Sequence, residues 1–388
     1  MRSLVTAAAL SALVLGAGAA PGAEPVRIGF IATLSGPGGA LGQDMLDGFR
    51  LGIDQAGGTL GGREIELLAE DDQLKPEVGL QIANRMIERD QVDIITGIVF
   101  SNVMMAVAKP VADAGVILLS QNAGPSPLAG EQCLANFFST SWQNDQSHEA
   151  MGKYLQDQGV KRLYVMAPNY QAGWDSIAGI RRYFEGEIVG EVYTRIGQPD
   201  YSAELAALRA AAPEATFVFY PGGMGINFVK QYAQAGLKDV APLYTAFTTD
   251  ELTLEAQGEA ALGVFASSFW TPSLDNETSR AFVDAFETAY ERVPSPYAAQ
   301  GYDAARLLDA ALGALPEGEV DDAALREALL NAEFDSVRGD FSFNVNHFPI
   351  QDFYIRKVVD EEGGLGFDTV AKAFNDHKDA YYEACELR

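Results

Sequence analysis

The sequence predicts an α/β protein with two doubly wound parallel sheets, arranged one after the other along the chain. Its 388 residues exceed what one hydrophobic core usually supports. Short apolar runs alternate with helical stretches from residue 24 onward, and the same alternation begins again after Ser141. A composition of 48% hydrophobic and 21% charged residues is typical of a globular protein. It excludes a disordered chain, a fibrous repeat and a protein with many membrane spans.

The first half predicts four strands separated by three helices. In the first helix, Leu41, Met45, Phe49 and Ile53 recur every four residues and therefore share one face. The expected strands are 26–33, 63–69, 92–99 and 116–120, and two further helices are expected around 78–86 and from residue 102. This order predicts right-handed crossovers and a ligand crevice at the carboxyl ends of the strands.

The second half repeats this architecture, and the tail departs from it. The expected strands are 162–167, 188–194, 216–220, 242–244 and 263–269, and the expected helices are 172–184, 203–212 and 225–235. Helices are then expected over 276–315 and 321–332, followed by a strand over 353–359 and a terminal helix. Such a tail would cross between the halves more than once, as in a clamp. We expect an N-terminal lobe of residues 24–142 plus 273–348 and a C-terminal lobe of residues 143–272 plus 349–388.

Residues 1–23 have the pattern of a cleaved export signal. Arg2 is followed by an apolar run over 4–16 and then by small residues. The alternative is a membrane anchor, but the run is shorter than the ~20 residues that span a bilayer. Cleavage after Ala23 would leave 388 − 23 = 365 residues and, without Arg2, a net charge of −27 − 1 = −28. We therefore expect a periplasmic protein.

Charge and residue types exclude several partners and chemistries. The 54 Asp+Glu against 27 Lys+Arg disfavour nucleic acid and anionic membrane surfaces as partners. Only three histidines are present, and they are scattered, so neither a metal site nor a cofactor is expected. The acidic run Glu70, Asp71 and Asp72 could bind a cation, although a solvated run of charges at a strand end is favoured.

The glycine-rich segment 35–42 follows a strand and begins a helix, but it does not fit a nucleotide-binding motif. No Gly-Lys-Ser/Thr follows it, and Leu41 stands where a dinucleotide site needs its third glycine. Its helix start favours an anion. No Gly-x-Ser-x-Gly motif or histidine indicates nucleophilic catalysis. A secreted α/β enzyme remains the alternative to a binding protein.

Cys133 and Cys385 would meet an oxidising compartment after export. We expect a disulfide that tethers the C-terminal helix to the middle of the chain. Two buried thiols are the alternative, because the sequence does not show how far apart the two residues lie.

The order of several motifs resembles that of exported type I solute-binding proteins, which serve ABC importers of the leucine/isoleucine/valine class. The matching segments are 28–30, 34–37, Gly42, 56–58, 70–72, 95–101, 119–123 and 169–173. The resemblance spans the mature chain. It implies the type I periplasmic-binding-protein fold, with two lobes joined by three hinge strands that close over a ligand. It also implies a monomer that works with the permease subunits of an ABC importer.

The resemblance also implies a ligand site. Ser101 and the backbone at Asn122, Ala123 and Gly124 match positions that hold a ligand carboxylate in the family, with two helix N-termini directed at them. The alternative role for Ser101 is the N-cap of the helix that starts at Asn102. The further expected ligand-binding residues are Leu41, Phe100, Tyr170, Trp174, Gly223 and Phe247.

Phe247 stands where the amino-acid binders of this family carry an acid that pairs with the ammonium group of the ligand. A buried ammonium without a partner is strongly disfavoured. We therefore expect a small carboxylate with an apolar, aromatic body and no required amino group. A branched-chain or other neutral amino acid is the alternative, with Asp175 or Asp250 supplying the acid.

Overall fold

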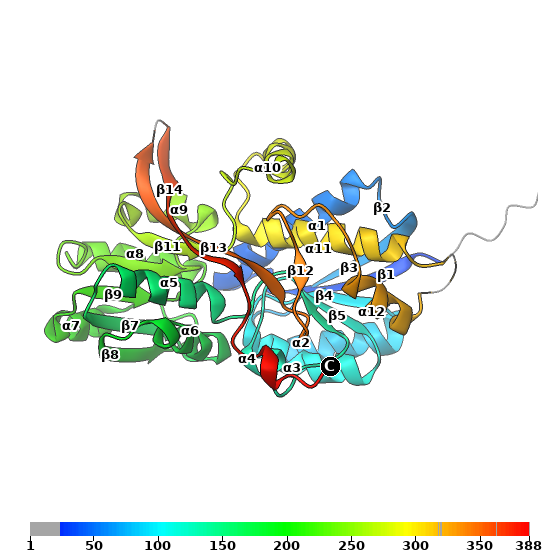
Figure 1. Cartoon of the computed structure of the whole chain (residues 1–388), viewed down its shortest axis with the longest axis horizontal. Helices are drawn as coiled ribbons and strands as arrows, with labels where there is room; N and C mark the ends of the chain where they lie inside the picture. The colour runs from blue at the N-terminus through cyan, green and yellow to red at the C-terminus, as the bar shows by residue number, and fades with distance from the viewer. Residues whose placement is uncertain (1–23, 317, 319, 362, 388) are drawn as a thin grey trace, which may run out of the picture.

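The computed structural model describes residues 24–316, 318, 320–361 and 363–387, so the expected signal peptide lies outside the described residues. Two lobes lie side by side (Figure 1): one contains β1 to β6, and the other contains β7 to β11. The predicted two-lobe α/β architecture is confirmed. No helix in the described part of the chain is long and apolar enough to cross a membrane.

The first lobe is built on a six-stranded sheet with the order β2-β3-β1-β4-β5-β6. Every pair is parallel except β2 with β3. The strands are β1 (Val26–Ala32), β2 (Thr59–Leu60), β3 (Arg63–Asp71), β4 (Ile94–Gly97), β5 (Ile117–Ser120) and β6 (Phe137–Ser139). The helices are α1 (Gly39–Gln55), α2 (Pro76–Arg85), α3 (Ser101–Asp113) and the single turn α4 (Ser126–Ala129). Strands β2 and β6 were not predicted, because two- and three-residue strands leave no periodicity in the sequence.

The second lobe contains the order β12-β13-β11-β10-β9-β7-β8, with β14 paired to β13. The strands are β7 (Arg162–Pro168), β8 (Glu187–Thr194), β9 (Ala215–Val218), β10 (Leu243–Ala246), β11 (Phe265–Ser268), β12 (Ser342–Phe343), β13 (Pro349–Glu361) and β14 (Gly364–His377). The helices are α5 (Gln146–Asp157), α6 (Gln171–Tyr183), α7 (Ser202–Ala211), α8 (Gly223–Gln234) and α9 (Glu251–Gln257). Strands β7 to β11 run parallel, and β13 is antiparallel to β11.

The prediction of a terminal helix is wrong. Residues 364–377 form β14, which folds back on β13 as a long antiparallel hairpin. Gly363 and Gly364 have φ values of 117° and 141° at the turn, a conformation that other residues rarely adopt. Only a short 3₁₀ turn, Tyr382–Ala384, follows.

The chain crosses three times between the two sheets, and the tail after β14 then crosses back to the first lobe, where Cys385 is bonded to Cys133. It leaves the first sheet after β6, returns after β11, and passes back between β12 and β13. The middle crossing brings α10 (Glu277–Tyr290), α11 (Pro296–Gly313) and α12 (Asp322–Leu330) to the first lobe. There α11 packs on α1, and the Tyr302 hydroxyl donates to Gln55 Oε1 at 2.6 Å. Three crossings agree with the hinge strands expected from the resemblance.

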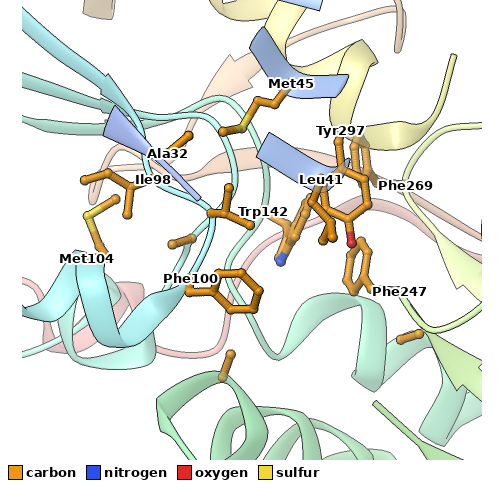
Figure 2. Close-up of a cluster of buried hydrophobic side chains, with 14 of the residues drawn as sticks. Ala32, Leu41, Met45, Ile98, Phe100, Met104, Trp142, Phe247, Phe269 and Tyr297 are labelled. Atoms are coloured by element: carbon orange, nitrogen blue, oxygen red, sulfur yellow. The ribbon is translucent and has the colours of Figure 1, made fainter. Parts of the chain in front are cut away.

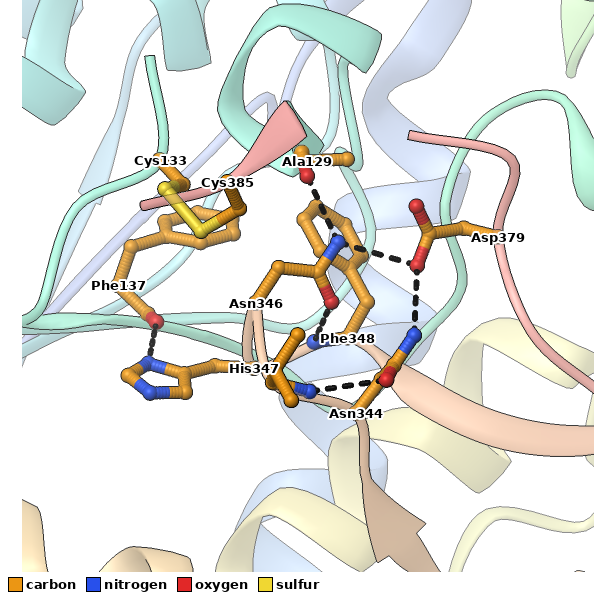
Figure 3. Close-up of a disulfide and its surroundings, with 10 residues drawn as sticks. Ala129, Cys133, Phe137, Asn344, Asn346, His347, Phe348, Asp379 and Cys385 are labelled. Atoms are coloured by element: carbon orange, nitrogen blue, oxygen red, sulfur yellow. Dashed lines mark hydrogen bonds between the residues drawn. A yellow bond between two sulfur atoms is a disulfide. The ribbon is translucent and has the colours of Figure 1, made fainter. Parts of the chain in front are cut away.

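A disulfide ties the C-terminal tail to the first lobe. Cys133 and Cys385 are bonded, with 5.6 Å between their Cα atoms and a sequence separation of 252. Figure 3 shows the polar contacts beside the bond, in which Asn346 Nδ2 donates to Ala129 O at 2.7 Å and to Asp379 Oδ2 at 3.0 Å. The predicted pairing is present in the structure, but the tethered segment is the tail after β14 and not a helix.

Candidate functional site

A small cavity lies between the lobes, at the carboxyl ends of the parallel strands of both sheets. Its volume is about 20 Å³. Figure 2 shows large side chains that come from both lobes and point toward one another here, among them Phe100, Trp142, Phe247 and Tyr297. Each of these four side chains is at most 5% exposed. The position agrees with the crevice that parallel α/β sheets use for ligands.

On the first lobe, the loop after β4 carries Ser101 to the cavity. Ile98 in this loop has a φ of 59°, an uncommon conformation for a β-branched residue, and its N–H donates to Ile31 O at 2.6 Å. Ser101 is the first residue of α3, and Phe100 is the N-cap, so the alternative N-cap role of Ser101 is wrong. Ser101 Oγ accepts a hydrogen bond from Asn144 Nδ2 at 3.1 Å. The hydroxyl proton of Ser101 is therefore free to be donated into the cavity.

The backbone after β5 does not offer all of the donors that the resemblance implied. The N–H of Ala123 donates to Ile98 O at 3.1 Å, and the N–H of Gly124 donates to Asn144 Oδ1 at 3.1 Å. Both groups thus hold the two loops together. The side chain of Asn122 is also engaged, donating to Val99 O at 2.5 Å and accepting from Gln300 at 2.8 Å. The expected second helix N-terminus is only the single turn α4.

The remaining donors on this wall are the first N–H groups of α3. The N–H groups at the start of a helix have no acceptor within the helix, and the helix dipole adds a partial positive charge there. Together with the hydroxyl of Ser101, they make this wall suitable for an anion.

Aromatic rings from both lobes line much of the rest of the cavity. Phe247 stacks on Trp142 with 4.2 Å between ring centroids, and Tyr170 lies 6.2 Å from Phe100 and 6.4 Å from Phe219. Phe247 has a φ of 54°, which costs on the order of 1–2 kcal/mol for a residue other than glycine. This conformation places the ring on Trp142 at the end of β10. The cavity therefore has one polar wall and one apolar, aromatic wall.

Eight residues that line the cavity were missed by the sequence analysis: Val99, Trp142, Asn144, His148, Ala172, Phe219, Pro221 and Tyr297. Four of these come from segments away from the expected strand ends. Trp142 and Asn144 lie in the crossing between β6 and α5, His148 lies on α5, and Tyr297 lies near the start of α11. None of them follows a strand of the expected pattern. Burial lowers the pKa of His148 to about 3 and raises that of Tyr297, so both side chains are neutral.

No aspartate or glutamate lines the cavity among the described residues. Asp175 lies behind Asn144 and accepts hydrogen bonds from Ser126, Gln171 and Asn144. Asp250 caps α9, where its Oδ1 accepts from Thr253. Burial raises the pKa of both carboxyl groups, that of Asp250 to about 7. Neither acid considered for an ammonium group reaches the cavity wall.

Three of the expected ligand-binding residues do not line the cavity. Trp174 is 48% exposed, and its Nε1 donates to Asn169 Oδ1 at 2.9 Å. Gly124 lies behind the wall, and Gly223 begins α8 beside Pro37 of the other lobe. Leu41, Phe100, Ser101, Asn122, Ala123, Tyr170 and Phe247 do line it.

The two lobes touch at the start of α8. Gly222 has a φ of 63°, and a Cβ atom there would lie 2.5 Å from Leu41 Cδ1 and 2.9 Å from Pro37 O. Only glycine permits this approach, which places the lobes in a closed arrangement.

The acidic run at the end of β3 positions loops. Asp71 Oδ1 accepts from the N–H of Leu34 at 2.9 Å, and Asp72 Oδ1 accepts from the hydroxyl of Thr33 at 2.5 Å. Asp72 is buried, so the expectation of a fully solvated run is wrong for this residue. No group of three or more metal-binding side chains is found among the described residues.

Comparison with known proteins decides the family. The family described as "Periplasmic binding protein" matches residues 25–364. The chain belongs to this family. Its members bind solutes and are not enzymes, so the secreted-enzyme alternative is wrong. The resemblance inferred from the sequence is confirmed.

Two solved structures and one curated relative illustrate the family. An ABC transporter solute-binding protein from R. palustris in complex with benzoate is 30% identical, covers 94% of this chain and 100% of its own, and has a TM-score of 0.88. A solute-binding protein from Rhodopseudomonas palustris BisB5 in complex with 3,4-dihydroxy benzoic acid is 29% identical, covers 92% and 99%, and has a TM-score of 0.85. The "Leu/Ile/Val-binding protein homolog 6" of Brucella melitensis is 26% identical and covers 96% of this chain and 97% of its own.

Proposed function

We propose that the protein is a periplasmic receptor that captures a small aromatic carboxylate between its lobes and delivers it to an ABC importer. The observation that carries this proposal is the division of the cavity into an anion-binding wall at Ser101 and an aromatic wall at Trp142 and Phe247. The two solved relatives that bind benzoate and a dihydroxybenzoic acid support the same ligand class.

The carboxylate is assigned to the start of α3. The hydroxyl of Ser101 and the first N–H groups of the helix would donate charge-assisted hydrogen bonds to it. Asn144 fixes the orientation of Ser101, because its Nδ2 donates to Ser101 Oγ and to Asp175 Oδ2 at 2.8 Å. The negative net charge of the chain is thus offset locally by oriented N–H groups.

The ring is assigned to the aromatic wall, which includes Tyr170, Phe247 and Trp142. A cavity of about 20 Å³ holds little more than one water molecule. The bound form must therefore hold Phe247 and its neighbours farther apart than they lie here. Because the lining residues are buried, a ligand enters only when the lobes separate about the three crossings, as in hinge closure.

A branched-chain amino acid is the second candidate, favoured by the name of the Brucella relative. Its ammonium group would need a carboxylate partner. The cavity wall offers none among the described residues, and Asp175 already accepts four hydrogen bonds. The aromatic acid is therefore preferred.

The proposal includes the periplasm, a cleaved signal at residues 1–23, and action as a monomer with permease subunits. The disulfide supports export, because such bonds persist in oxidising compartments. The proposal keeps the lobe boundaries predicted from the sequence as far as β14 and assigns the tail after it to the first lobe, to which Cys385 is bonded.

Calorimetry on protein that has been unfolded and refolded, to remove bound solute, tests the ligand class. Benzoate is expected to bind, whereas leucine, isoleucine and valine are expected to give no signal. Cyclohexanecarboxylate, which has a similar size and charge but no aromatic ring, separates ring recognition from simple apolar burial. Tight binding of leucine together with no binding of any aromatic acid would overturn the proposal.

A further inference from the structure

His148, which lines the cavity, has an unused hydrogen-bond acceptor. Its Nδ1 lies 2.6 Å from the carbonyl oxygen of Asn144. A carbonyl oxygen can only accept, so Nδ1 carries the proton of this contact. The other ring nitrogen, Nε2, is buried and has no hydrogen-bond partner. His148 itself is 1% exposed and lines the cavity.

The surroundings of the ring keep His148 neutral. Its edge contacts are with Phe217 at 5.8 Å, Phe219 at 5.1 Å and Phe247 at 6.2 Å between ring centroids. A second proton on Nε2 would place an imidazolium among these rings, and burial accordingly lowers the pKa of His148 to about 3. Nε2 is therefore a bare lone pair inside an aromatic wall.

Asn144 links this acceptor to the anion-binding wall. Its side-chain Nδ2 donates to Ser101 Oγ, while its main-chain carbonyl accepts from His148 Nδ1. One residue thus positions a donor on the first lobe and an acceptor on α5. A carboxylate is repelled by a bare nitrogen lone pair and attracted by the donors at Ser101, so the two groups orient a ligand with its carboxylate toward α3.

We propose that His148 Nε2 accepts a hydrogen bond from a hydroxyl group on the ring of the ligand, which makes the site selective for hydroxylated aromatic acids. The inference rests on the proposed function. An unpaired buried acceptor is unfavourable, and a ring hydroxyl would satisfy it, whereas an unsubstituted ring would not. A site built to hydrogen-bond a hydroxyl rejects the analogue without it far more strongly than an apolar pocket rejects a size change.

The test compares ligands of matched size on the wild-type protein. Calorimetry measures the Kd of 3- and 4-hydroxybenzoate, of 3- and 4-fluorobenzoate, which lack the hydroxyl donor, and of benzoate. At least one hydroxybenzoate is expected to bind 10-fold or more tightly than its fluoro counterpart. The variant His148→Phe is expected to lose this preference, so that each hydroxybenzoate and its fluoro counterpart bind it within 3-fold of each other.

His347→Phe is the matched control, because His347 is also buried and also uses Nδ1 on a backbone carbonyl, that of Phe137, but does not line the cavity. It should keep the preference. Equal affinity of hydroxy- and fluorobenzoates for the wild type overturns the inference and leaves the proposed function standing. Equal weakening of benzoate and hydroxybenzoate in His148→Phe also overturns it. Absence of binding by every aromatic acid overturns the proposed function as well. If His148→Phe does not fold, the wild-type comparison decides.

Discussion

Replacement of Ser101 by alanine isolates the hydroxyl that we assign to the ligand carboxylate. Ser101 is 2% exposed, and its Oγ has one recorded partner, Asn144 Nδ2. That amide also donates to Asp175 Oδ2, so the substitution does not leave it without a partner. The loss of stability should therefore stay near 1 kcal/mol, the net value of one hydrogen bond.

The effect on binding should be larger. A hydrogen bond to a charged group contributes ~1.5–3 kcal/mol, which corresponds to a roughly 10- to 150-fold weaker Kd for benzoate. Calorimetry measures the Kd, and thermal melting of the same preparation verifies folding. Ser202→Ala is the matched control, because Ser202 is likewise the first residue of a helix but is exposed and bonded to Asp200. It should bind benzoate as the wild type does.

A folded Ser101→Ala protein that binds benzoate within 2-fold of the wild type would refute the assignment. The carboxylate would then lie elsewhere in the cavity, and the positions that we assign to the carboxylate and to the ring would have to be exchanged. A loss of binding in both serine variants would instead indicate a general defect.

Three further results are expected. Gly222→Ala should weaken benzoate binding ~10-fold or more, because its Cβ would meet Leu41 and Pro37 O when the lobes close; it should also lower the stability by ~1–3 kcal/mol, because residue 222 has a φ of 63°, and unchanged affinity in calorimetry would show that this contact is not needed. Reduction of Cys133–Cys385 should lower the free energy of unfolding in urea by up to ~5 kcal/mol, since the bond closes a chain segment of 252 residues; identical urea midpoints with and without reductant would contradict this. Burial and Glu251 raise the pKa of Asp250 from 3.8 to about 7. The folded protein therefore binds more protons than the unfolded chain between pH 4 and 7, and this contribution to stability is lost as pH rises through 7. In Asp250→Asn, the melting temperature should depend less on pH between pH 4.5 and 8, and the variant should be more stable than the wild type at pH 8, by at most ~4 kcal/mol; an unchanged dependence of the melting temperature on pH would exclude Asp250 as its source.

Much of the site on the first lobe was predictable because parallel strands bring their carboxyl ends to one edge. Ser101 follows β4 and Asn122 follows β5, and both were expected at the crevice and line the cavity. Phe247 follows β10 and lines it as well. Local order along the chain is sufficient for such residues, since each is placed by the strand directly before it.

Other features of the fold and of the site depend on contacts between residues far apart in the sequence, and they leave no local pattern. Trp174 lies near the start of α6 but turns outward to Asn169, while Trp142 enters the cavity from an irregular crossing. A terminal helix was expected after the strand 353–359, but residues 364–377 pair with β13 over a glycine turn. Whether the N–H of Gly124 is free or bonded to Asn144 could not be read from either residue alone.

The sequence by itself determined the two α/β lobes, the family and the strand ends that line the cavity, because periodicity and motif order are local properties of the chain. Only the tertiary structure decided which polar groups remain free in the cavity. Asn144 engages Ser101, Gly124 and His148 at once, and these residues approach one another only when both lobes and a crossing are in place. Hydrogen-bond partners are fixed by proximity in space, and proximity across the lobes is set by packing and not by neighbouring residues in the sequence.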